Sequence, residues 1–127
     1  MSRHARNAKR AKDALAATPD AERAVIGDLS NISETRSVAD QVNRLGTFDT
    51  VIHNAAVGDR ERKRIRTQDG LPHVFATNIL TPYILRALIH WPKRLVYLSS
   101  GLHRDVNTTL SDLLWTKAEV ARIGSLR

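Results

Sequence analysis

The 127-residue sequence contains no cysteine, which excludes a disulfide framework and a thiolate metal site. This composition fits a reducing compartment, and we expect a cytoplasmic protein. Residues 1–6 are charged and no apolar run follows them, so they do not resemble a secretory signal. The longest apolar-rich stretch, residues 79–91, is interrupted by polar residues and a proline, far short of the ~20 apolar residues that span a bilayer.

Aromatic residues are also scarce, at 5% of the chain. None interleaves with the basic residues, so the stacking platforms of a nucleic-acid binder are missing, and a nucleic-acid partner is disfavoured. The formal charge is nevertheless +7, and half of the 20 Lys and Arg residues lie in two short stretches. The first stretch contains Arg3, Arg6, Lys9, Arg10 and Lys12, and the second contains Arg60, Arg62, Lys63, Arg64 and Arg66. Such clusters attract phosphate, although a solvated basic loop and helix face is the simpler explanation.

The remaining composition is that of a folded domain, with 42% hydrophobic and 26% charged residues. A chain of this length forms one domain and buries about two-thirds of its unfolded surface. Two helices are clear in the first half. Residues 8–17 are strong helix formers that end before Pro19. A second helix, capped by Asn31 or Ser33, continues to Gly46 and carries one apolar face.

Short apolar runs at residues 24–26, 50–53 and 94–99 predict buried strands. Residues 54–70 form a polar loop, and residues 71–91 an apolar helix broken by Pro82. A last helix is expected at 110–122. Because helices alternate with strands, we expect an α/β fold with a mostly parallel sheet. Ligands of such sheets bind at the carboxyl ends of the strands, so the residues after each strand are the informative ones.

Four short motifs occupy those positions. They are Asp28-Leu29, residues 53–58 (His-Asn-Ala-Ala-Val-Gly), residues 77–82 (Thr-Asn-Ile-Leu-Thr-Pro) and residues 99–101 (Ser-Ser-Gly). In this order and spacing the set resembles the short-chain dehydrogenase/reductase family over residues 3–104. The resemblance implies a partial three-layer Rossmann-type fold, with residues 1–127 as a single incomplete NAD(P)-binding domain.

The resemblance also implies a cofactor site. Asp28 would meet the adenine amino group and Leu29 would lie beside the ring. Asn54, Ala55 and Ala56 match the motif beside the adenine ribose, where Ala56 replaces a glycine and Gly58 restores backbone freedom. A plain tight turn is the alternative explanation for these residues.

Arg6 and Asn7 follow the position where the family's second strand ends. A basic residue there favours the 2′-phosphate of NADP over NAD. Arg6 is therefore the candidate phosphate ligand, assisted by Lys9 and Arg10. A solvated helix turn is the alternative.

The resemblance assigns catalytic roles to Ser100, which would bind the substrate oxygen, and to Asn78. Pro82 has no N–H, so the carbonyl of Asn78 loses its helical partner and is free to hold a relay water. The alternatives are an ordinary turn after a strand for Ser100 and an ordinary proline kink for Asn78.

Two family motifs do not occur in the sequence. No Gly-x-x-x-Gly-x-Gly is present, and the first strand that precedes this loop in the family is expected to be missing. That strand lies between the second and the fourth, so we expect a gap in the sheet with unpaired backbone on both sides and a marginal or misassembled fold.

Tyr-x-x-x-Lys is also missing, because Tyr83 and Tyr97 are followed four residues later by Ala87 and Gly101. Leu113 occupies the tyrosine position before Lys117, and leucine cannot transfer a proton. The alternative is that residues 112–115 resemble part of an insertion found in some relatives, in which case the tyrosine is expected beyond Arg127.

We therefore expect the full-length parent to transfer hydride between NAD(P)(H) and a small-molecule carbonyl or alcohol, with this chain inactive as given. The alternative is a non-catalytic pseudoenzyme of the same fold that binds a nucleotide or a partner. The sequence leaves the substrate, the reaction direction and the oligomeric state open, a homo-oligomer included.

Overall fold

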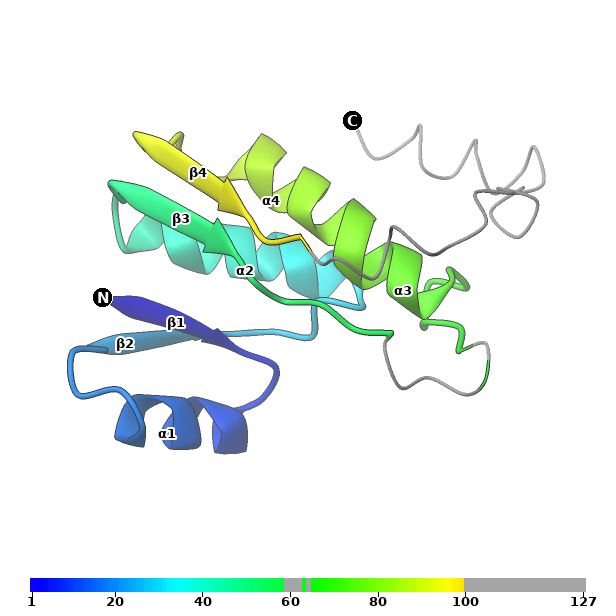
Figure 1. Cartoon of the computed structure of the whole chain (residues 1–127), viewed down its shortest axis with the longest axis horizontal. Coiled ribbons are helices and arrows are strands. Elements are labelled where there is room, and N and C mark those ends of the chain that lie inside the picture. Colours follow the sequence, from blue (N-terminus) through cyan, green and yellow to red (C-terminus); the bar gives the residue numbers. More distant parts are fainter. Residues whose placement is uncertain (59–62, 64, 100–127) are drawn as a thin grey trace.

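The computed structural model describes residues 1–58, 63 and 65–99. It has an α/β architecture in which four short strands form two separate parallel pairs (Figure 1). The expected helix at 110–122 lies outside the described residues. The expected α/β class and the partial Rossmann-type arrangement are confirmed.

The first pair joins β1 (Ser2–Ala5) to β2 (Arg23–Ile26), and the second joins β3 (Thr50–His53) to β4 (Arg94–Tyr97). Both pairs are parallel, with Ala5 opposite Ile26 and His53 opposite Tyr97. The first pair continues through the N–H of Gly27, which donates to the carbonyl of Ala5 at 3.1 Å. All four arrows point the same way in Figure 1, so the four carboxyl ends lie at one edge.

Two helices begin at side-chain caps. The Oδ1 of Asn7 accepts from the N–H of Arg10 at the start of α1 (Ala8–Ala16), and the Oδ1 of Asn31 accepts from the N–H of Glu34 at the start of α2 (Ile32–Arg44). Gly46 follows α2 with a φ of 106°, a conformation that glycine adopts without strain. Both predicted helices are confirmed, and Asn31 is the cap of the second.

The helix expected at 71–91 differs from the prediction. It consists of α3 (His73–Phe75), a π-helical turn η1 (Ala76–Leu80) and α4 (Thr81–Leu88). Pro82 does not break the helix but lies in the first turn of α4. The turn before it is widened instead, and the N–H of Thr81 reaches back to the carbonyl of Ala76. A wider turn accommodates a proline because it relieves the clash between the ring and the preceding turn.

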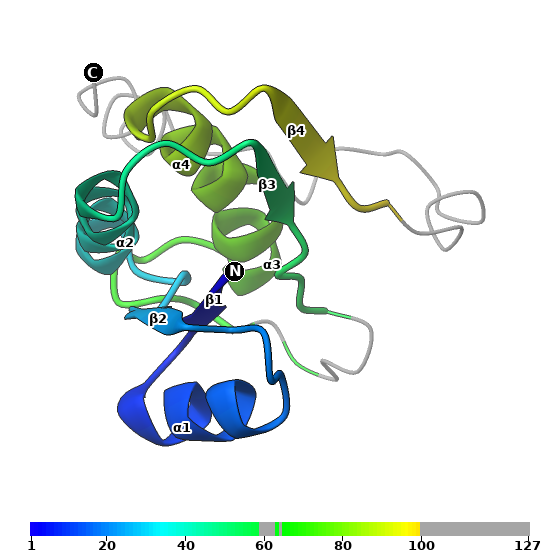
Figure 2. The same cartoon turned by 90° about the vertical axis from the view of Figure 1, so that its left-hand side faces the viewer.

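The core lies where α2 and α4 pack together against β2. One cluster joins Val25, Leu29 and Val38, with Leu85 of α4 against it. A second cluster joins Leu71, Ala76, Leu80 and Ile84 along the π turn and α4. Figure 2 shows α2 and α4 on one side of the strands and α1 on the other side of β1 and β2. This gives the three layers of a Rossmann-type unit.

Candidate functional site

The carboxyl-terminal edge of the strands gathers most of the predicted cofactor residues. Arg6 and Asn7 follow β1, Asp28 follows β2, and Asn54 follows β3. Arg6 and Asn54 are exposed, and Asp28 is partly buried. Ser100 lies outside the described residues. The edge therefore combines an exposed cation, a carboxylate and an amide, which are groups that can bind a phosphate and a nucleoside.

Asp28 is held in a defined turn. Its Oδ1 accepts from the N–H of Ser30 at 2.9 Å and from the Ser30 hydroxyl at 2.8 Å, while its own N–H donates to Glu34 Oε2 at 2.7 Å. Burial alone would raise the pKa of Asp28, but the Ser30 hydrogen bonds and the positive charges of Arg6 and His73 bring it below its ordinary value. Asp28 is therefore an ionised acceptor at neutral pH, in the electrostatic field of Arg6.

Asn78 clamps the loop after β3 to the π turn. Its Oδ1 accepts from the N–H of Val57 at 2.9 Å, and its Nδ2 donates to the carbonyl of Val57 at 2.9 Å. The side chain is thus occupied by the loop. The relay water predicted from the sequence would use the main-chain carbonyl of Asn78, so this contact leaves that prediction untested.

Three curated proteins are similar to this chain. An uncharacterized oxidoreductase of Emericella nidulans is 47% identical over 112 residues, which cover 87% of this chain and 44% of that protein. Two proteins named short-chain dehydrogenase, from Gibberella zeae and Penicillium rubens, are 40% and 38% identical, and the chain covers 42% and 43% of them. This chain belongs to the short-chain dehydrogenase/reductase family. No protein-family model matches it. The chain spans less than half the length of the curated relatives it matches.

The other predicted cofactor residues of this family member lie in different environments. The side chain of Leu29 is only 8% exposed and packs in the core, and its carbonyl accepts from the hydroxyl of Thr81. Ala55 and Ala56 are exposed. Gly58 has a φ of 119°, and a Cβ there would lie 2.9 Å from Val74 Cγ2, so this position requires glycine. The roles of Leu29, Ala55, Ala56 and Gly58 toward adenosine stay predictions.

Two buried polar atoms were not singled out from the sequence. His53 Nε2 and Thr77 Oγ1 are buried and have no hydrogen-bond partner among the described residues. The His53 ring stacks on Tyr97 with centroids 4.9 Å apart and planes at 18°. A histidine at the end of an otherwise apolar strand was the available signal for this feature. Both side chains line a cavity between the two strand pairs.

Burial lowers the pKa of His53 below its ordinary value of 6.5. Above that value the imidazole is neutral in both the folded and the unfolded chain. As the pH falls through 6.5, His53 becomes protonated in the unfolded chain but stays neutral in the folded chain. The free energy of unfolding therefore decreases. We expect the wild type to lose stability relative to His53→Gln between about pH 7.5 and 5.5.

Thermal unfolding of both proteins across this pH range measures the difference. His90→Gln replaces an exposed histidine and should keep the wild-type profile. Parallel pH profiles for the wild type and His53→Gln would contradict the expectation.

Neither a metal cluster nor a membrane span is found in the described part of the chain. No group of three or more His, Asp or Glu residues there could hold a metal ion, and no helix there is both long and apolar enough to cross a membrane.

Proposed function

We propose that this chain forms the adenosine-binding side of an NADP-dependent oxidoreductase that transfers hydride between an alcohol and a carbonyl. One observation carries the proposal: Arg6 and Asp28 follow neighbouring parallel strands, and the charge of Arg6 reaches the Asp28 carboxylate. A cation beside a carboxylate at this edge can bind the 2′-phosphate and the adenine of NADP at the same time. Because NAD has no 2′-phosphate, the cation favours NADP over NAD.

The residues divide the work as follows. Arg6, with Lys9 and Arg10 nearby in sequence, would bind the 2′-phosphate, Asp28 the adenine amino group, and Asn54 the ribose. Asn78 would position the relay water and Ser100 the substrate oxygen. The bound cofactor supplies the hydride chemistry, and these residues supply orientation and charge. The tyrosine that would pass the proton is not present in the sequence, and a general acid contributes ~10²–10⁴-fold to rate, so the isolated chain is inactive.

The phosphate ligand can be tested without the rest of the cofactor. Adenosine 2′,5′-bisphosphate carries the 2′-phosphate, and adenosine 5′-monophosphate does not. We expect Arg6→Glu to weaken binding of the bisphosphate about 10-fold or more, the loss of one charge-assisted hydrogen bond to phosphate, and to leave the monophosphate unaffected. Isothermal titration calorimetry with the purified chain measures both affinities.

Arg23→Glu is the matched control, because Arg23 is exposed and lies at the amino end of β2, away from the site. If both variants weakened bisphosphate binding equally, the loss would come from the change in net charge alone. That result would contradict the assignment of Arg6 as the phosphate ligand. Adding NADPH and a panel of aldehydes and ketones should give no oxidation. Turnover by the chain alone would contradict the expectation that it is inactive. NADPH binding without turnover in a complete protein would favour the pseudoenzyme alternative.

A further inference from the structure

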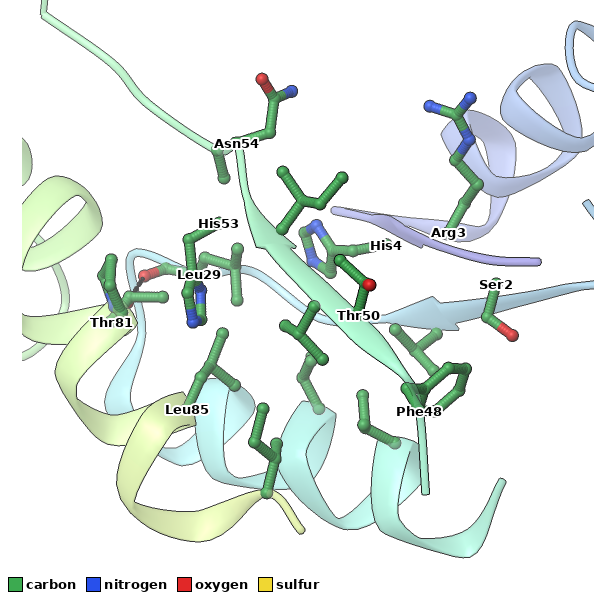
Figure 3. Close-up of a pocket in the computed structure, with 18 of the residues that line it drawn as sticks. Ser2, Arg3, His4, Leu29, Phe48, Thr50, His53, Asn54, Thr81 and Leu85 are labelled. Atoms are coloured by element: carbon green, nitrogen blue, oxygen red, sulfur yellow. Dashed lines mark hydrogen bonds between the residues drawn. The ribbon is translucent and has the colours of Figure 1, made fainter. Parts of the chain in front are cut away.

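Two buried threonines join α2 and α4 to the segment that carries Asp28. Thr35 of α2 is 0% exposed and Thr81, the first residue of α4, is 4% exposed. Their hydroxyl oxygens lie 3.4 Å apart. The Thr35 hydroxyl donates to the carbonyl of Asn31 at 2.8 Å, and the Thr81 hydroxyl donates to the carbonyl of Leu29, as the dashed line in Figure 3 marks. Both hydroxyls therefore bind main-chain carbonyls close to Asp28.

The carbonyl of Leu29 depends on Thr81 for its hydrogen bond. Leu29 is only 8% exposed, and among the described residues no backbone N–H donates to this carbonyl. A hydroxyl carries one proton and a carbonyl oxygen can only accept, so Thr81 is the donor. Because a buried carbonyl without a donor is costly, we expect it to turn away from α4 when the hydroxyl is removed.

The opposite end of this peptide group binds the carboxylate of Asp28. The carbonyl of Leu29 and the N–H of Ser30 belong to one peptide bond, which is planar. The N–H of Ser30 donates to Asp28 Oδ1 at 2.9 Å. Thr81 thus fixes one end of the plane, and the Asp28 carboxylate binds the other. A rotation that moves the carbonyl away from Thr81 also moves the N–H away from Asp28.

The preceding peptide group is held by other elements. The carbonyl of Gly27 lies 2.8 Å from Nε2 of His4 in β1, and the N–H of Asp28 donates to Oε2 of Glu34 in α2 at 2.7 Å. These contacts fix the main chain of Asp28. The contact from α4 differs from them because it acts, through one peptide group, on the carboxylate itself.

The π turn places Thr81 where it can make this contact. The N–H of Thr81 reaches back to the carbonyl of Ala76, which defines the widened turn. Asn78, within the same turn, binds the main chain of Val57 in the loop after β3. The turn and the residue that ends it therefore reach two of the loops at the carboxyl edge of the strands. Widened turns of this kind are frequent at functional sites.

We propose that Thr81 is a positioning residue of the nucleotide site, whose hydroxyl orients the Leu29–Ser30 peptide and, through it, the Asp28 carboxylate. The proposal rests on the proposed function for the identity of the ligand, the adenine amino group. The orientation of Asp28 is a property of the chain without ligand. Thr77, in the π turn, is the contrasting case, because it is 5% exposed and its hydroxyl has no partner among the described residues.

Nucleotide binding tests the proposal first. Thr81→Val removes the hydroxyl and keeps a branched side chain. We expect it to weaken binding of adenosine 5′-monophosphate and adenosine 2′,5′-bisphosphate by the same factor, about 5-fold, because both carry the adenine. Thr81→Ser keeps the hydroxyl and should bind both nucleotides as the wild type does. Thr77→Val is the matched control and should leave both affinities unchanged. Isothermal titration calorimetry measures them, and a loss confined to the bisphosphate would overturn the proposal.

The carboxylate itself gives a second measurement that needs no ligand. Burial raises the pKa of Asp28, and the hydrogen bonds from Ser30 and the charges of Arg6 and His73 bring it below its ordinary value. Thr81→Val should raise this pKa, because the N–H of Ser30 moves away from the carboxylate. Thr81→Ser and Thr77→Val should not change it. Carbon-13 NMR of the Asp28 carboxyl group follows the titration.

The two measurements separate this proposal from the proposed function. If the wild type bound neither nucleotide, the proposed function would fail, and the titration of Asp28 would still decide the role of Thr81. An unchanged pKa of Asp28 in Thr81→Val would overturn that role, whether or not nucleotides bind.

The wild type decides the question if Thr81→Val does not fold. Its Thr81 hydroxyl proton, buried and bonded to the carbonyl of Leu29, should exchange with water slowly enough to give a separate proton NMR signal. Rapid exchange of this proton would show that Thr81 does not hold the carbonyl, and the proposal would then be wrong.

Discussion

Asn78→Leu is expected to destabilise the chain by about 2–4 kcal/mol. The leucine has a similar shape but forms neither hydrogen bond to Val57, so the loop after β3 loses its attachment to the π turn. The N–H and carbonyl of Val57 are then left without partners in a partly buried position, which adds a desolvation cost. Thermal unfolding should show a melting temperature lower by roughly 10 °C or more.

Two further variants calibrate this effect. Asn78→Asp keeps an acceptor for the N–H of Val57 and removes the donor to its carbonyl, so it should lose about half as much stability. Asn54→Leu changes an exposed asparagine of the same loop and should stay within about 0.5 kcal/mol of the wild type. A stability loss for Asn78→Leu no larger than that for Asn54→Leu would show that the clamp contributes nothing measurable.

The second large effect is expected at Gly27. A Cβ at this position would lie 2.6 Å from Val38 Cγ2 and 3.1 Å from the carbonyl oxygen of Glu34. Val38 is 2% exposed and cannot move aside, and the Glu34 carbonyl belongs to α2. Gly27→Val should therefore cost about 3 kcal/mol through overpacking, measured by urea denaturation.

The physical cause can be separated by a double variant. Val38→Ala removes the closest atom, so Gly27→Val combined with Val38→Ala should be less destabilising than the sum of the two single changes. Gly46→Val is the contrasting case, because a Cβ added there would have no described atom within 4 Å, and the φ of 106° alone opposes the substitution. Additive losses in the double variant would exclude a steric origin at Gly27.

Local signals accounted for most of the helices and strands. The asparagine caps, the apolar face of α2 and the apolar runs of β2, β3 and β4 are encoded within a few residues, so the sequence was sufficient to predict them. β1 has no apolar run, because Ser2, Arg3 and His4 are polar. The hydrophobic pattern therefore did not predict it, and only the family resemblance indicated a strand there. Its partner β2, far along the chain, is what holds it extended.

The position of the candidate residues was predictable, but their contacts were less so. The motifs proposed Asp28, Asn54 and Asn78 as candidates, and the ends of parallel strands explain why the first two share an edge. The clamp between Asn78 and Val57 depends on how a loop meets a helix 21 residues away, which no local rule predicts. The unpartnered His53 and Thr77 are likewise products of packing, since their burial depends on both strand pairs.

The π turn also sets the rotational phase of the helix that follows it. Such a turn accommodates an extra residue compared with an α-helix, and each residue of an α-helix advances the side chains by about 100°. Removing one residue from Ala76–Leu80 would therefore rotate α4 by that angle and turn Ile84 and Leu85 away from the clusters they now complete. Substitutions in this turn are tolerable where side chains are exposed, as at Ile79, but its length is fixed by two separate parts of the core.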